Sequence, residues 1–154
     1  MADLTFDGTD IREATAPTAG GLFFDIVAGF RGIAEVRGSD RILPGKAGRT
    51  ARSRVKDRRV IRLHGYIHGG PTSGSLVTRQ QDFLANVVVA QALFDPDDAA
   101  KDLVATDPYM GLSAAATSTI SARVLNVIEG REQMGVYQEW DVVLEAVGDP
   151  PDWA

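Results

Sequence analysis

Alternation of inward apolar residues with mostly polar or aromatic ones over Arg59–Gly69, RVIRLHGYIHG, constrains the fold more than any other stretch of the sequence. A two-residue period is typical of a β-strand with one buried and one exposed face. The inward residues are Ile61, Leu63, Gly65 and Ile67, and the outward residues are Val60, Arg62, His64, Tyr66 and His68. The sequence therefore predicts a half-buried strand whose outer face carries polar and aromatic side chains.

A second alternating stretch, residues 136–147, predicts another half-buried strand. Its expected inner face is Val136, Gln138, Trp140, Val142, Leu144 and Ala146. Thr119–Glu129 is rich in β-branched residues, and the turn-forming GREQMG joins it to the alternating stretch, which predicts a hairpin. Shorter strands are expected at Gly21–Phe30, Gly32–Arg37 and Lys101–Thr106.

One helix is expected, over about residues 78–94. Thr78 and Gln81 fit a capping box, in which a threonine at the helix start is followed three residues later by glutamine. Apolar residues then recur at helical spacing and predict one apolar stripe. They are Phe83, Val87, Ala90 and Phe94, with Leu84, Val88 and Gln91 alongside. Pro96 cannot continue a helix and ends it.

These elements predict a mainly β fold, an antiparallel β-sandwich or barrel with one flanking helix, because one helix cannot cover both faces of a parallel sheet. A chain of 154 residues, 44% of them hydrophobic, is expected to form a single domain over residues 1–154 with one core. Within it, the polar and acidic residues 1–19 are expected to form an N-terminal arm. No stretch predicts a signal peptide or a membrane span.

Positive charge is concentrated in the middle of the chain. Ten of the 16 Lys and Arg residues lie between Arg37 and Arg62, whereas 13 acids and three basic residues lie between Asp82 and the end. Residues 38–59 show no helical or strand period, which predicts a long extended basic loop, either solvated or ordered against a partner. Because arginine pairs with carboxylates across interfaces, the acidic half of a neighbouring copy is the expected target.

The candidate inter-subunit residues are the basic side chains of this loop and the outward residues of the strand that follows. They are Arg41, Lys46, Arg49, Arg52, Arg54, Lys56, Arg58, Arg59, His64, Tyr66 and His68. We expect Arg52→Glu combined with Arg54→Glu to weaken assembly and to leave the domain folded. If the two histidines meet acids of a neighbour, assembly should weaken as the imidazoles lose their protons.

The sequence offers no catalytic or metal-binding pattern. The absence of cysteine excludes disulfides and thiol chemistry. His64 and His68 are four residues apart, and on a strand roughly 13 Å separates them, too far for both to bind one metal within a chain. There is no GxSxG motif or P-loop, and the acids Glu129, Glu132 and Glu139 are expected to be solvated. We therefore expect no enzyme, no cofactor and no metal.

The order of these segments resembles the distal tail protein (Dit) family of long-tailed bacteriophages, in the small form common in phages of actinobacteria. The resemblance spans roughly Gly21 to Trp153, from VRGSDRILPGKAGR and RRVIRLHGYIHG through TRQQDFLANV to EWDVVLEAVGDPPDW. Its most specific part is Val36–Gly69. The family supplies no catalytic residues to transfer to this chain.

The resemblance implies a β-sandwich with one flanking helix that assembles into a ring, usually a hexamer, between tail tube and baseplate. The implied partners are other copies of the chain, the tail tube protein, the hub or baseplate protein and the tape-measure protein, with DNA only in passage and no membrane. The implied location is the virion tail, with the host cytoplasm during assembly. This sequence leaves no room for the extra carbohydrate-binding or arm domain of many family members.

Two other kinds of protein stay open at this point. A major tail tube, tail terminator or adaptor protein of a phage tail would share the sandwich-plus-helix plan. A small nucleic-acid- or carbohydrate-binding module is the further alternative. The basic loop contains no aromatic residue, which disfavours binding of nucleic acid.

Overall fold

The computed structural model describes residues 4–12, 20–30, 35–37, 41–42, 49–50, 55–70, 74–106, 117–148 and 153. In these ranges it has one helix, α1 (Leu76–Leu93), and eleven strands. The strands are β1 (Leu4–Phe6), β2 (Thr9–Asp10), β3 (Gly20–Ala28), β4 (Glu35–Arg37), β5 (Arg41–Ile42), β6 (Arg49–Thr50), β7 (Val55–Arg58), β8 (Val60–Gly69), β9 (Lys101–Thr106), β10 (Thr117–Glu129) and β11 (Tyr137–Ala146). The expected fold class, mainly antiparallel β with one helix, is confirmed.

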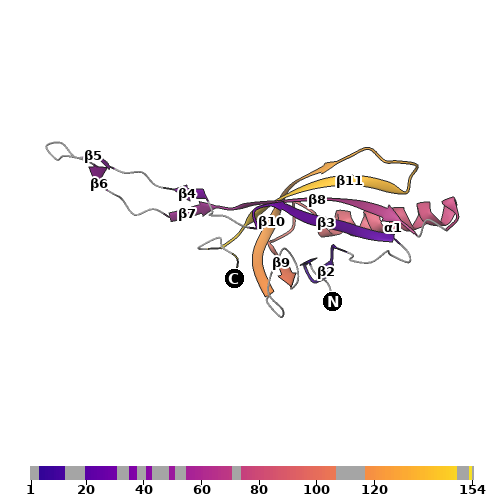
Figure 1. Ribbon diagram of the computed structural model, residues 1–154, viewed down its shortest axis with the longest axis horizontal. Helices are drawn as coiled ribbons and strands as arrows, with labels where there is room; N and C mark the ends of the chain where they lie inside the picture. Colours follow the sequence, from indigo (N-terminus) through magenta and orange to yellow (C-terminus); the bar gives the residue numbers. More distant parts are fainter. Residues whose placement is uncertain are drawn as a thin grey trace.

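Seven strands form one curved sheet in the order β2-β1-β9-β10-β11-β8-β3 (Figure 1). The first half of β10 pairs with β9 and the second half with β11, and a bulge interrupts β10 between Val124 and Asn126. Bulges bend strands, so β10 can serve two layers of a sandwich-like fold. The two ends of the sheet meet where the amide of Phe24 donates to the carbonyl of Ile11.

The core fills the space that this curved sheet encloses. The alternation predicted for β8 and β11 is confirmed, since the inward side chains of both strands are buried and the outward ones are partly or fully exposed. The predicted hairpin is also confirmed, because β10 and β11 pair in antiparallel fashion. Met134 and Gly135, in the connecting turn, both have positive φ angles.

Helix α1 packs against β8 and β3 and buries Phe83, Ala90 and Leu93. The helix begins earlier than expected, because its N-cap is Ser75, whose side chain accepts a hydrogen bond from the amide of Thr78. The predicted stripe is also partly wrong. Leu84 and Val88 are 60% and 64% exposed, since they lie on the flank of α1 that faces away from the sheet.

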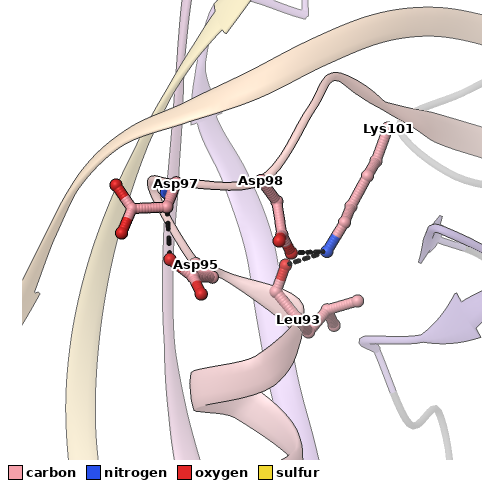
Figure 2. Close-up of polar contacts among 5 residues, drawn as sticks. All are labelled: Leu93, Asp95, Asp97, Asp98 and Lys101. Atoms are coloured by element: carbon pink, nitrogen blue, oxygen red, sulfur yellow. Dashed lines mark hydrogen bonds and ion pairs between the residues drawn. The ribbon is translucent and has the colours of Figure 1, made fainter.

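Lys101, at the start of β9, stabilises the end of α1 (Figure 2). Its Nζ donates to the carbonyl oxygen of Leu93 at 3.1 Å and pairs with the carboxylate of Asp98 at 2.6 Å. Figure 2 also shows the tight turn after the helix, in which the amide of Asp97 donates to the Asp95 side chain. A cation at a helix C-terminus is favourable because the last carbonyls carry partial negative charge.

Lys101→Gln is expected to lower the free energy of unfolding by about 1–2 kcal/mol, because the Leu93 carbonyl loses a charged donor. Urea denaturation measures this loss. Arg131→Gln removes one positive charge from an exposed turn and is the matched control, with an expected effect below about 0.5 kcal/mol. Equal losses in the two variants would contradict the capping role.

Residues 4–12 contribute to the sheet rather than forming an arm throughout residues 1–19. β1 pairs with β2 and with β9, and the side chains of Leu4, Phe6 and Ile11 are fully buried. Although this stretch is acidic overall, three of its apolar side chains lie in the core. Residues 13–19 of the expected arm lie outside the described ranges.

The strands that lie between β3 and β8 in the sequence form a β-ribbon that projects from the body of the molecule (Figure 1). We call β4, β5, β6 and β7 together the ribbon; β4 pairs with β7, and β5 pairs with β6. The expected loop over residues 38–59 is thus corrected, since β5, β6 and β7 lie in it.

No helix in the described part of the chain is long and apolar enough to cross a membrane.

Candidate functional site

The outward candidates predicted from the sequence, His64, Tyr66 and His68, lie on the outer face of the sheet at β3, β8 and β11. The strand registers place Tyr66 beside Phe23 on β3 and beside Glu139 on β11. His68 lies beside Tyr137 in the same way. Phe23 and Tyr137 were not among the candidate residues, because a two-residue period shows which face a side chain occupies but not which neighbours it meets.

We call Phe23, Tyr66 and Tyr137 the aromatic ladder. The ring centroids of Phe23 and Tyr66 are 5.3 Å apart with planes 17° from parallel, and those of Tyr66 and Tyr137 are 5.1 Å apart. The Arg12 guanidinium lies 5.7 Å from the centre of the Phe23 ring. These ring contacts connect β3, β8 and β11 on the outer face of the sheet.

His64 forms an exposed cross-strand pair on the same face. Its Nδ1 lies 2.7 Å from a carboxylate oxygen of Asp141, and the two side chains are 47% and 55% exposed. His68, four residues along β8, contacts Tyr66 instead, with ring centroids 5.6 Å apart. In the described ranges, no group of three or more potential ligands could hold a metal ion.

The surroundings of the ladder shift two pKa values. The pKa of Tyr137 is raised, first by burial and then by its hydrogen bond to the Glu139 carboxylate, at 3.1 Å, and that group's charge. The pKa of His68 lies below its ordinary value of 6.5, first because burial disfavours the imidazolium and then because of the positive charge of Arg79. A neutral imidazole at position 68 is therefore part of the folded state near neutral pH.

Folding stability should decrease as the pH falls through the range in which His68 takes up its proton. The unfolded chain binds a proton at this site near pH 6.5, whereas the folded chain binds it only at lower pH. The stabilising contribution is thus present above pH 6.5 and is lost as the pH falls toward the folded pKa. We expect His68→Gln to lose less stability than the unmodified chain between about pH 7.5 and about pH 5 in urea denaturation. An equal loss would contradict this assignment.

The base of the ribbon is fixed by contacts that meet at one carbonyl. The oxygen of Gly29 accepts a hydrogen bond from Nη1 of Arg59 and another from Nε1 of Trp153, each at 3.0 Å. The ring of Trp153 also packs edge-on against Phe30, with centroids 5.0 Å apart. The carbonyl of Arg59 in turn accepts from the amide of Ala146, at 2.9 Å. We call Gly29 and Arg59, where the chain leaves and re-enters the body, the two feet of the ribbon. Both are therefore held by residues near the C-terminal end of the described chain.

Arg59, one of the candidate contact residues, is buried within the chain. It is only 7% exposed, lies between β7 and β8, and donates a hydrogen bond from Nη1 to the Gly29 carbonyl oxygen; a contact with a neighbouring copy stays a prediction. Arg41, Arg49, Lys56 and Arg58 lie on ribbon strands, with side chains outside the described part. Lys46, Arg52 and Arg54 are outside it altogether. The proposed contacts of these seven residues therefore stay predictions.

Comparisons with known proteins show a likeness of fold to solved structures. Neither the protein-family models nor the curated proteins include a match to this chain. Among solved structures, the fold is similar to the SPP1 Dit protein, described as a paradigm of the hub adsorption apparatus in phages that infect Gram-positive bacteria. The TM-score is 0.56 at 12% sequence identity, over 96% of this chain and 50% of the SPP1 protein. The two proteins share a fold, and this chain spans half the length of the SPP1 protein.

Proposed function

We propose that the chain is a structural, non-catalytic subunit of a bacteriophage tail, which forms a ring at the distal end between the tail tube and the hub or baseplate. The observation that carries this proposal is the Dit-like fold over 96% of the chain. The order of elements, with a ribbon between β3 and β8 and a single helix after β8, is the order in which the sequence resembles that family.

The distribution of charge supports assembly with other copies. The ribbon lies in the basic stretch, whereas the acidic stretch from Asp82 to the end contains β9, β10 and β11 and the acidic turn Asp95–Asp98. In a ring, each subunit presents one surface to a different surface of the next, so basic and acidic regions on one chain can be complementary. A two-stranded ribbon is also marginally stable alone, which favours a partner for it.

The proposed partners follow from this position in the tail. They are other copies of the chain in a ring, a hexamer in the proposal, and the tail tube, hub or baseplate and tape-measure proteins, with DNA passing through the ring. The proposed location is the virion tail, after assembly in the host cytoplasm.

The mass of the purified chain in solution tests the proposal. We expect a closed ring of about six copies, alone or after addition of the tail tube protein, by native mass spectrometry and negative-stain electron microscopy. Long filaments of stacked rings would favour a tail tube protein instead. A monomer under both conditions would overturn the proposal.

Charge reversal on the ribbon should weaken the ring. Arg49→Glu combined with Lys56→Glu, on β6 and β7, is expected to raise the protein concentration needed for assembly at least about tenfold, because attraction to the acidic surface becomes repulsion. Arg62→Glu combined with Arg131→Glu makes the same charge change at two exposed positions outside the ribbon and is the matched control. Equal effects of the two double variants on sedimentation would show that the ribbon has no special part in assembly.

A further inference from the structure

A tryptophan far away in the sequence contacts the place where the ribbon joins the body. The ribbon leaves the sheet after Ala28, the last residue of β3, and returns at Val60, the first residue of β8. Trp153, 124 positions after Gly29, reaches this junction and donates its indole N–H to the Gly29 carbonyl. The described body has no sheet pairing that involves residue 153.

The backbone at Gly29 lies close against the start of β8, with no room for a side chain. Gly29 has a φ of +95°, which favours glycine, and a Cβ at this position would lie 2.8 Å from the Cα of Ile61. Arg59, at the other foot of the ribbon, donates to the same oxygen. One acceptor thus connects the outgoing foot, the returning foot and the C-terminal segment.

Phe30 adds a second contact at the same point. Its ring meets that of Trp153 edge to face, with planes at 70°, and both side chains are partly buried against the core. Phe30 is the first described residue beyond Gly29 on the way into the ribbon. The Trp153 ring therefore contacts the chain at Phe30, where it leaves β3 toward the ribbon, while its N–H binds the carbonyl just before it.

We propose that Trp153 is a positioning residue, whose docking on Gly29 and Phe30 sets the direction in which the ribbon leaves the body. Release of this tryptophan breaks no strand pairing of the sheet, so it can free the ribbon without unfolding the body. A ribbon already held in one direction loses less conformational entropy when it binds, which strengthens association. The effect on assembly rests on the proposed function, whereas the effect on ribbon direction does not.

Spin labels can measure the direction of the ribbon because the chain contains no cysteine. Thr50→Cys places one label on β6, and Asn126→Cys places the other at an exposed position of β10. Double electron–electron resonance then gives the distribution of distances between ribbon and body. Small amounts of labelled chain are mixed with an excess of unlabelled chain, so that only distances within one copy are recorded.

Trp153→Ala is expected to broaden this distance distribution clearly and to leave the cooperative unfolding of the body in place. Trp153→Phe keeps a ring against Phe30 and should give a distribution nearer to that of the unmodified chain. Met134→Ala, a side chain that is 75% exposed in the β10–β11 turn, is the control and should leave the distribution unchanged. A distribution unaffected by Trp153→Ala, or broadened as much by Met134→Ala, would overturn the proposal.

Assembly provides a second, separable measurement. If the unmodified chain forms a ring, Trp153→Ala should weaken its association roughly fivefold, about the cost of ordering one or two more side chains. A broadened ribbon together with unchanged association would overturn the link to assembly. Failure of the unmodified chain to form a ring would count against the proposed function and leave the distance measurement as the test of Trp153.

Discussion

Gly65→Ala is expected to lower the free energy of unfolding by about 4 kcal/mol, because β3 and β8 cannot keep their present separation around a methyl group. A Cβ at this position would lie 2.6 Å from the Cα of Phe24 and would collide with the backbone carbonyl of Phe23. Phe24 and Trp140, the two cross-strand partners of Gly65, are both buried, so neither side offers room. Urea denaturation followed by circular dichroism measures the loss.

Gly8→Ala separates this steric cost from the conformational cost of replacing a glycine. Gly8 has a φ of +75°, but a Cβ there would meet no atom within 4 Å. Its expected loss is therefore only about 1–2 kcal/mol, the cost of a left-handed conformation in an L-residue. Similar losses in the two variants would show that β3 and β8 can separate at little cost, and would contradict the close approach.

Phe94→Ala is expected to cost about 3–5 kcal/mol, the range for removal of a buried phenylalanine ring. Phe94 ends α1, and its ring stacks on Phe6 of β1 at 5.6 Å and meets Phe24 of β3 edge-on at 5.1 Å. The ring thus joins the helix to both ends of the curved sheet. A loss of near-ultraviolet circular dichroism should accompany the lower stability, since three aromatic side chains lose their packing.

Leu84→Ala is the matched control for this truncation. Leu84 lies on the same helix but is 60% exposed, so its replacement should change the free energy of unfolding by less than about 0.5 kcal/mol. Phe94→Leu should fall between the two because it keeps most of the apolar volume. A small loss for Phe94→Ala would mean that the three elements are held together by other contacts.

The main sheet could be predicted well because two of its central strands alternate strictly. In β8 and β11, each inward position from Ile61 to Ile67 and from Gln138 to Ala146 is buried. The start of α1 could not be fixed in the same way, since both Ser75 and Thr78 have side chains suited to an N-cap. The structure selects Ser75 as the N-cap, and Gly69 allows α1 to pass close to the end of β8. A Cβ there would lie 2.6 Å from the amide nitrogen of Phe83.

The candidate surface could be predicted only in part. The outward placement of His64, Tyr66 and His68 followed from the period of two, but their partners depend on strand order and register. The stacking of Tyr66 on Phe23 joins residues 43 positions apart, as numbered in the sequence. The burial of Arg59 could not be predicted for a related reason. Its charge suggested exposure, whereas the Gly29 carbonyl that accepts its hydrogen bond is visible only in three dimensions.

The two tryptophans of the chain give the molecule two separate optical reporters. Trp140 is 2% exposed, and its indole N–H donates to Gln138 inside the core. Trp153 is partly exposed and lies at the foot of the ribbon. Fluorescence from Trp140 should therefore resist a water-soluble quencher until the core opens, whereas emission from Trp153 should respond when a neighbouring molecule covers the ribbon base. Quenching of a single unlabelled sample can then distinguish assembly from unfolding.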